Sequence, residues 1–441
     1  MAELVTLLVE KPLYGGDCVA RDVATNEQVR VPFAIAGERV TATVADAARR
    51  GEMRGATLVD VVERADQRVA PTCRHFGACG GCQLQHMSQA AQLHAKEQVL
   101  SDTFTRAGLH NLPAMQVSSA ELWGYRNRIR LRVKDDEIGY SRRGTNVFLP
   151  VTECPIASPL LWRAATAMRE LARWPVGTHE VEIFATADDA AMQMAVHVDA
   201  TVATVDRDAP RSLRAMCEAL QASVPQLVGA GLLVGAAVDA KSKRVQESAR
   251  VEIARWGAPG LTYRVGEIAY GVTRNAFFQV NRYLTTRMVD LVLGTRGGAQ
   301  VWDLFAGAGL FSVPLTQRFA QVIAVEIGEP AANDLAKQLR ACGPGHDAER
   351  STVLAFLQRA SAHAPDVIVM DPPRAGLGGA VVQALLRIQA PELVYVSCDP
   401  VSFARDARAL LDSDYTMYAL HLIDMFPQTF HTETVAVFRR N

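Results

Sequence analysis

Cys398 stands where a buried strand is expected to end, in the run SCDP at 397–400. A lone cysteine in such a place is usually a small apolar residue. Here the Asp-Pro pair stops the strand, and a helix is expected to begin near Ser402. The N-terminus of that helix would lie close to the thiol and stabilise the thiolate, which is the nucleophilic form. The position predicts a catalytic nucleophile.

Three further strands of the C-terminal region end in acids. Asp303 precedes a glycine-rich loop, Glu326 ends the next strand, and Asp371 precedes two prolines. Ligands of an open parallel sheet bind outside the carboxyl ends of its strands. Ser312 replaces the third glycine of a dinucleotide fingerprint, so a nicotinamide cofactor fits poorly. S-adenosylmethionine, which has no pyrophosphate, fits better, and the strand ends predict a methyltransferase.

A cysteine beside a methyl donor suits methylation at C5 of a pyrimidine. C5 is a weak nucleophile, and addition of a thiolate at C6 converts the ring to an enolate that attacks the methyl group. A base must then remove the C5 proton. The C-terminal segment offers Glu433 and His431 for this task. Alone, both would be read as polar residues at the start of a strand.

Four cysteines are spaced as metal ligands. Cys73, Cys79 and Cys82 lie within ten residues, and Cys154 is a distant fourth. Four thiolates suit structural zinc, although zinc ribbons usually carry two Cys-x2-Cys pairs and this chain has one. They equally suit an iron–sulfur cluster. Spacing by itself does not separate the two.

The pattern of the chain changes twice, which predicts a multidomain protein. Residues 1–66 read as short alternating strands with turn signals, typical of a small barrel or sandwich. Residues 67–275 mix strands with helices at 88–107, 159–173 and 208–222, and a strand at 232–238, as in an α+β domain. Residues 276–441 alternate apolar strands with helices, which predicts a parallel, Rossmann-like α/β sheet covered on both faces.

A basic stripe in the central region is a candidate RNA contact. Residues 126–134 alternate basic and apolar types, so in a strand the basic side chains share one face. Such a face could contact phosphates. It could equally be a solvated face, and the sequence does not decide.

The composition limits which classes of function and location the chain can have. The 441 residues are 49% apolar and 21% charged with a net charge of −1, so evidence for a nucleic-acid partner must be local. No apolar run approaches the roughly 20 residues that span a bilayer, and the N-terminus is a poor signal peptide. We expect a cytoplasmic protein without a membrane partner or an obligate protein partner.

The catalytic motifs resemble the RNA uracil-5 methyltransferases, which act on tRNA and rRNA. The likeness covers nearly the whole chain and rests on FFQVN at 277–281, DLFAG at 303–307, DPPRAG at 371–376, YVSCDP at 395–400 and HTE at 431–433. It implies that Cys398 attacks C6 and that Glu433 accepts the proton. The residues implied to contact the methyl donor are Gln279, Phe305, Leu310, Glu326, Asp371 and, at the adenine, Asp347.

Two positions depart from the family pattern. Leu310 replaces a usual Asn, which leaves only a backbone or apolar contact with the donor. Asp399 follows the nucleophile where Asn is common.

The resemblance also assigns the two N-terminal regions. CRHFGACGGCQLQH at 73–86 with TECP at 152–155 resembles the [4Fe-4S] segment of the rRNA-acting branch, which implies Cys73, Cys79, Cys82 and Cys154 as ligands. PLYGG at 12–16 and GERV at 37–40 resemble a TRAM domain, an OB-like RNA-binding barrel. Together they favour methylation of an unpaired uridine in 23S rRNA, since the base must leave its stack.

The sequence leaves three alternative functions open. The first is the same reaction on tRNA. Amino-group methylation is a second, but its motif continues with an aromatic residue where this chain has Arg374, and it needs no Cys398. A non-catalytic RNA-binding or assembly factor is the third, and the catalytic residue types at every strand end argue against it.

Overall fold

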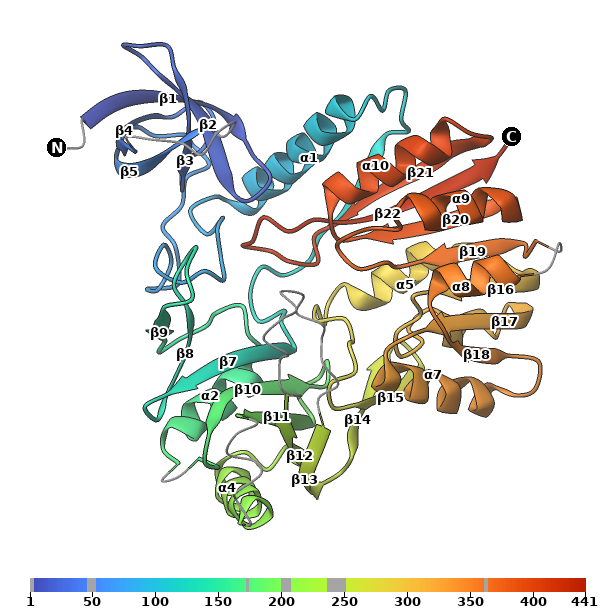
Figure 1. Cartoon of the computed structure of the whole chain (residues 1–441). Coiled ribbons are helices and arrows are strands. Elements are labelled where there is room, and N and C mark those ends of the chain that lie inside the picture. The colour runs from blue at the N-terminus through green and yellow to red at the C-terminus, as the bar shows by residue number, and fades with distance from the viewer. Residues whose placement is uncertain (1–3, 46–52, 172–173, 200–207, 236–250, 361–363) are drawn as a thin grey trace, which may run out of the picture.

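Three β-sheet units follow one another along the chain in the computed structural model (Figure 1), which describes residues 4–45, 53–171, 174–199, 208–235, 251–360 and 364–441. The multidomain prediction is confirmed. The predicted strand at 232–238 and helix at 159–173 extend into residues outside these ranges.

The N-terminal unit is a closed five-stranded barrel in the order β1-β2-β3-β5-β4. Alternate residues such as Leu7, Val29 and Val40 point inward and form its core, because successive strand side chains face opposite sides. Closure leaves no free edge in the barrel. Its strands are β1 Leu4–Pro12, β2 Asp17–Asp22, β3 Gln28–Pro32, β4 Arg39–Val44 and β5 Arg54–Glu63.

The central unit is a seven-stranded, mostly antiparallel sheet in the order β13-β12-β11-β10-β7-β8-β9. Two amphipathic helices, α2 Pro159–Arg169 and α4 Ala209–Ser223, bury leucine, alanine and methionine against it. The strands are β7 Arg128–Lys134, β8 Glu137–Ser141, β9 Phe148–Pro150, β10 Thr178–Ala185, β11 Met192–Val198, β12 Leu227–Val234 and β13 Val251–Gly257.

The C-terminal unit is an eight-stranded sheet in the order β18-β17-β16-β19-β20-β22-β21-β6. The expected alternation of strand and helix from residue 300 to 411 is confirmed, but the sheet is not wholly parallel, because its C-terminal strand runs antiparallel to both neighbours. Its strands are β6 Met115–Ser118, β16 Gly298–Leu304, β17 Phe319–Glu326, β18 Asp347–Arg350, β19 Val367–Met370, β20 Glu392–Ser397, β21 Tyr415–Ile423 and β22 Glu433–Arg440.

Helices cover both faces of this sheet, as its continuous apolar strands require. Alternate residues face opposite cores: Val301 packs in one and Trp302 in the other. The first core includes α5 Thr285–Leu293, and the second includes α1 Gln89–Arg106, α8 Val353–Arg359, α9 Gly379–Ile388 and α10 Pro400–Leu411. The short α6 Ser312–Leu315 follows β16, and α7 Glu329–Cys342 follows β17.

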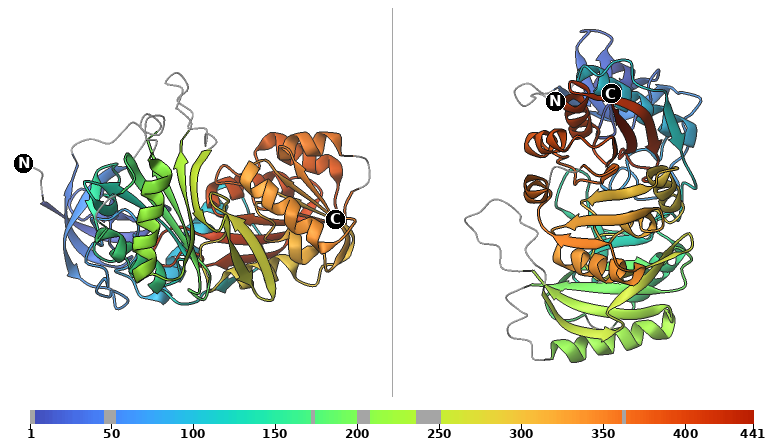
Figure 2. Two further views of the ribbon diagram at one scale, coloured as in Figure 1. Left: turned by 90° about the horizontal axis from the view of Figure 1, so that it is seen from below. Right: turned by 90° about the vertical axis from the view of Figure 1, so that its right-hand side faces the viewer.

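Three segments from the region 67–275 join or pack against the C-terminal sheet. Strand β6 pairs in parallel with β21, and Leu100 and Phe104 of α1 enter the same core as α10. The hairpin β14 Gly260–Val265 and β15 Ile268–Thr273 packs in the other core. The boundaries at 66 and 275 stay predictions, but the strand pairing and shared cores join the units across them; Figure 2 shows the units from two further sides.

Helix α1 links the barrel to the C-terminal sheet (Figure 1). Ser88 caps its N-terminus by accepting a hydrogen bond from the Ala91 amide. Near its middle, buried Lys96 donates to Asp424 Oδ1 at 2.6 Å and to the Phe426 carbonyl at 3.0 Å. This ion pair fastens the helix to the segment between β21 and β22.

No helix in the described ranges is long and apolar enough to cross a membrane.

Replacing Lys96 by Met should destabilise the protein by on the order of 3–5 kcal/mol, because the Asp424 carboxylate would remain buried without its cation. Lys11 is the matched control, since it pairs with Asp102 of the same helix at 2.6 Å but is 44% exposed. Lys11→Met should cost under about 1 kcal/mol. Urea titration measures the free energy of unfolding of both variants. Equal decreases in this free energy would contradict the stabilising role of the buried Lys96–Asp424 pair.

Candidate active site

Cys398 and Glu433 lie at the same end of two neighbouring strands of the C-terminal sheet. Strand β22 runs antiparallel to β20, with Ser397 paired to Thr434. Cys398 directly follows Ser397, and Glu433 directly precedes Thr434. The two side chains are close enough that the Glu433 charge acts on the Cys398 thiol.

The Cys398 thiol is neutral in the free protein. Burial, helped by the negative charges of Glu433 and Asp371, raises its pKa to about 12. Helix α10 begins two residues after Cys398, as expected, but its first free amides do not donate to the thiol. Asp399 caps α10 instead, and its Oδ1 accepts hydrogen bonds from the amides of Val401 at 3.1 Å and Ser402 at 2.8 Å.

Two buried carboxyls, Asp303 and Glu433, and the half-buried Asp371 share this edge. Burial raises the pKa of Asp303 to about 7, and burial together with Asp303 does the same for Asp371. Glu433 is 3% exposed, and burial beside Asp371 raises its pKa well above the ordinary value. Asp303 Oδ1 is buried and accepts no hydrogen bond. An orphaned oxygen and clustered acids are the arrangement that a cationic ligand stabilises, and S-adenosylmethionine carries both a sulfonium and an ammonium.

The loop after β16 departs from ordinary strand geometry at its first residue. Phe305 has a φ of 62°, which is unusual for a bulky residue and costs on the order of 1–3 kcal/mol. Gly307 follows with a φ of 56°, and its amide donates to Glu326 Oε2 at 2.9 Å. The Gly328 amide holds Glu326 Oε1 at 2.6 Å. Phe305 and Glu326 each directly follow one of the paired residues Leu304 and Val325, so both lie at the ends of adjacent strands.

Gln279 and Leu310 are placed by other contacts. Gln279 is 5% exposed in the segment after β15, and its carbonyl accepts from Asn127 Nδ2 at 3.4 Å. The Leu310 side chain lies in the hydrophobic core. Its carbonyl accepts a hydrogen bond from the Tyr270 hydroxyl at 3.0 Å. If the methyl donor contacts the Leu310 carbonyl, that oxygen accepts from both the methyl donor and Tyr270.

Asp347 is not brought to the edge with the others. It begins β18, is exposed, and pairs with Ile323, three residues before Glu326. Parallel strands rise about 3.3 Å per residue, so Asp347 lies roughly 10 Å short of the carboxyl ends. Arg350 is the β18 residue that pairs with Glu326.

His431, the other candidate base, is held neutral. Burial and the nearby Arg374 guanidinium lower its pKa to about 4. Arg374 Nη2 lies 3.4 Å from His431 Nε2. The same guanidinium acts to lower the pKa values of Cys398 and Glu433, so it favours their charged forms.

The four candidate ligand cysteines lie near one another in the central unit. Charges on the other three thiols each affect the pKa of Cys82, which burial raises to about 12. Two sulfurs accept hydrogen bonds: Cys79 Sγ from the Gly81 amide at 3.4 Å and Cys154 Sγ from the Tyr140 hydroxyl at 3.7 Å. Among the described residues, no group of three or more His, Cys, Asp or Glu has a metal-binding arrangement.

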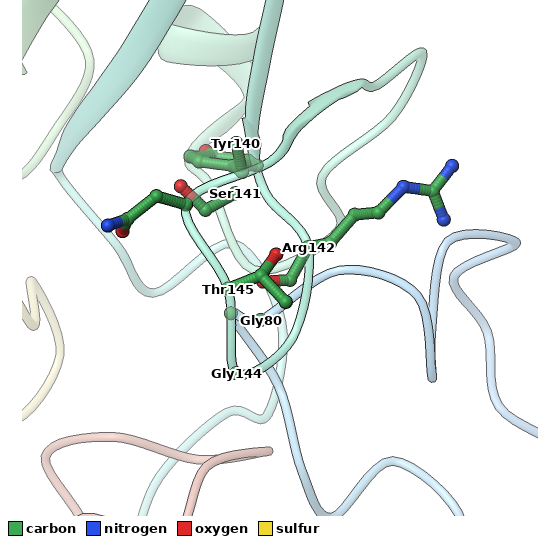
Figure 3. A pocket seen from close by; sticks show the side chains of 8 residues that line it. Gly80, Tyr140, Ser141, Arg142, Gly144 and Thr145 are labelled. Carbon is green, nitrogen blue, oxygen red and sulfur yellow. The ribbon is translucent and has the colours of Figure 1, made fainter.

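An open pocket adjoins this cysteine region (Figure 3). Its volume is about 480 Å³, and it lies between the cysteine segment and the β8–β9 hairpin. Gly80 and Gly81 line one side, and Tyr140, Ser141, Arg142, Gly144, Thr145 and Asn146 line the other. The pocket is separate from the strand-end site.

The basic stripe on β7 is partly paired within its own sheet. Arg128 is buried against the Phe184 ring at 4.1 Å and lies 3.6 Å from Glu182. Arg130 pairs with the same Glu182 at 2.8 Å. Sequence alternation correctly predicts the shared face, but not the acids of β10, which lie beside it only in the folded sheet.

The sequence motif gives Asp303 no role in binding a ligand. It predicts only an acid before the glycine-rich loop. The burial and orphaned oxygen of Asp303 mark it as part of the charged site. An aspartate inside an apolar strand was the available signal, because such a charge is rarely buried without a purpose.

Comparisons with known proteins agree with this geometry. The model of the family described as "tRNA (Uracil-5-)-methyltransferase" matches residues 260–341 and 358–441. A 23S rRNA (uracil(1939)-C(5))-methyltransferase RlmD of Chromohalobacter salexigens is 32% identical, over 99% of this chain and 89% of the relative. The enzyme of the same name from Halomonas elongata is 31% identical, over 97% and 88%.

A solved structure has the same fold. The Pyrococcus abyssi tRNA (uracil-54, C5)-methyltransferase, in complex with S-adenosyl-L-homocysteine, aligns over 98% of this chain and 100% of its own with a TM-score of 0.75 and 23% identity. With the close relatives, the strand-end carboxyls and the paired cysteine and glutamate, the chain belongs to the S-adenosylmethionine-dependent RNA (uracil-5-)-methyltransferase family.

Proposed function

We propose that this enzyme methylates C5 of a specific uridine in 23S rRNA through a covalent bond between Cys398 and C6. The observation that carries the proposal is that Cys398 and Glu433 flank the last paired residues of β20 and β22, with the charges of Glu433 and Asp371 close enough to act on the thiol. A nucleophile and a base on neighbouring strand ends can act on adjacent carbons of one ring.

The proposed steps use both residues. The Cys398 thiol loses its proton to solvent and its sulfur adds to C6, and the electrons of the C5=C6 bond move to O4 as an enolate. C5 then takes the methyl group of S-adenosylmethionine, which leaves as S-adenosylhomocysteine. Glu433 removes the C5 proton, the double bond forms again, and the S–C6 bond breaks to release the thiolate.

Charge in the site supports this order of events. Burial beside Asp371 favours the neutral acid of Glu433 in the free protein. A sulfonium cation within a few ångströms of these carboxyls stabilises their ionised forms. Donor binding therefore prepares Glu433 to accept a proton.

Cys398→Ala should lower the methylation rate roughly 10⁴-fold or more, because covalent attack then no longer activates the ring. Donor binding should persist. Glu433→Gln should instead accumulate a covalent protein–RNA complex, since the C5 proton stays in place. Transfer of tritium from labelled donor measures methylation, and denaturing gels detect the covalent complex. Cys342→Ala is the control, because Cys342 is exposed. Methylation surviving in Cys398→Ala would falsify the nucleophile assignment.

We propose that the donor lies against Gln279, Phe305, Leu310, Glu326 and Asp371. Glu326 ends β17, where a carboxylate can accept hydrogen bonds from a ribose diol. Its two amide contacts leave further lone pairs for this purpose. Asp303 and Asp371 supply negative charge for the cationic groups of the donor.

Donor affinity should rise about tenfold from pH 6 to pH 8, because a carboxyl with a pKa near 7 passes from mostly protonated to mostly ionised over that range. Only the ionised form attracts the sulfonium, so binding releases protons. Calorimetry in buffers of different ionisation enthalpy measures both effects. S-adenosylhomocysteine, with a neutral sulfur, and the Asp371→Asn variant should each show a weaker dependence. A pH-independent affinity would contradict this role of the carboxyls.

The RNA assignment rests on the named relatives. Two are 23S rRNA enzymes by name, whereas the matched fold belongs to a tRNA enzyme by name. The tRNA reaction is the alternative, and mass mapping of 5-methyluridine in both RNAs from a deletion strain distinguishes them. Such RNAs are made in the cytoplasm, so the expected location is part of this proposal. A non-catalytic assembly role predicts that neither RNA loses the mark.

We further propose that Cys73, Cys79, Cys82 and Cys154 hold a [4Fe-4S] cluster and that the N-terminal barrel is a TRAM domain that contacts RNA. In support, the four thiols influence one another electrostatically. Two of the sulfurs accept N–H or O–H hydrogen bonds, as cluster sulfurs commonly do. The closed barrel has the architecture expected of such a module.

Cys154→Ser should remove the iron, the acid-labile sulfide and the visible absorption of anaerobically purified protein, because three cysteines hold a four-iron cluster poorly. Cys217→Ser is the control, because Cys217 is a buried residue of α4 that packs in the hydrophobic core. Stoichiometric zinc without iron in the wild-type protein would rule out the cluster.

A further inference from the structure

A tyrosine of the N-terminal barrel reaches the catalytic edge. Tyr14 lies in the turn between β1 and β2, and its hydroxyl donates a hydrogen bond to Asp399 Oδ2 at 2.9 Å, across 385 residues of chain. Burial and the neighbouring Asp399 carboxylate raise the pKa of Tyr14, so the hydroxyl keeps its proton and acts as donor. Asp399 directly follows Cys398.

Asp399 is held from two sides. Its Oδ1 accepts the hydrogen bonds of Val401 and Ser402 at the start of α10, while Oδ2 accepts from Tyr14. Its amide also contacts Ser397 Oγ at 3.4 Å. Both carboxylate oxygens are therefore engaged, and these hydrogen bonds restrain the residue that directly follows Cys398.

The same tyrosine touches the segment that carries the base. Its ring meets Phe430 edge-on, with centroids 5.3 Å apart, three residues before Glu433. The turn is seated closely there: a Cβ on Gly16 would lie 2.7 Å from Gln83 Cβ and 3.5 Å from Phe430 Cβ. One barrel side chain therefore contacts the segments of both catalytic residues.

We propose that Tyr14 is a positioning residue that couples the barrel to the nucleophile, holding Cys398 through Asp399 and bracing the Glu433 segment through Phe430. The proposal rests on the proposed function of Cys398. It gives the barrel a task besides RNA contact: the chemistry is aligned when the barrel is seated on the catalytic unit.

The test removes only the hydroxyl. Tyr14→Phe keeps the ring against Phe430 and should slow covalent attack about tenfold, as expected when a hydrogen bond to a charged acceptor is lost. The readout is the rate of adduct formation at saturating protein, with donor present, on a 23S rRNA transcript containing 5-fluorouridine. Fluorine at C5 is not removed as a proton is, so the adduct persists on denaturing gels.

Two comparisons separate positioning from general stability. Tyr415→Phe is the matched control, because that hydroxyl donates to the Ala390 carbonyl at 2.7 Å away from the site. It should leave the rate unchanged. In an Asp399→Ala background, Tyr14→Phe should have no further effect on the rate, since Tyr14 acts through Asp399.

The outcomes are distinct. A slower adduct rate with unchanged RNA affinity and melting temperature, and loss of the effect in the Asp399→Ala background, supports the coupling. An unchanged rate overturns it, and so does a change in RNA affinity alone, which would make Tyr14 an RNA contact. Should Tyr14→Phe unfold, Asp399→Asn tests the same link. If wild-type protein forms no adduct, or Cys398→Ala still forms one, the proposed function fails and this inference with it.

Discussion

The antiparallel pairing of β22 with β20 is the constraint on which the catalytic edge depends. The strands from β16 to β20 run parallel, so each carries its end residue to the same edge. A further parallel strand would deliver its start at the opposite edge. Because β22 returns antiparallel, its first residue, Glu433, arrives beside Cys398.

Burial of like charges is the second organising feature. Asp303, Asp371 and Glu433 lie in a low-dielectric region where each disfavours ionisation of the next. Their raised pKa values mean that the folded protein holds protons that the unfolded chain has lost, so this cluster lowers the stability of the free protein progressively as pH rises from about 4 to about 7. A cationic methyl donor would stabilise the ionised carboxylates, so under the proposed function the groups that weaken the free protein strengthen donor binding.

The segment between β21 and β22 gathers contacts from every unit. Gln428 accepts amide hydrogen bonds from Gln83 and Leu84 of the cysteine region, and the Tyr125 hydroxyl holds the Pro427 carbonyl. Lys96 secures the start of the segment through Asp424. The position of Glu433 therefore depends on the assembly of the whole chain, which gives a physical reason why a methyltransferase sheet carries two further units.

The sequence by itself determined four of the five barrel strands, the alternating strands and helices between residues 300 and 411, and the acids and cysteine that end those strands. These follow from local periodicity and turn residues, which are encoded within a few positions. Tertiary structure alone decided that Cys398 lies beside Glu433, that Asp347 stops short of the site, and that Asp399 rather than the thiol takes the helix N-terminus. Register, burial and contacts across hundreds of residues set these features, and no local pattern carries them.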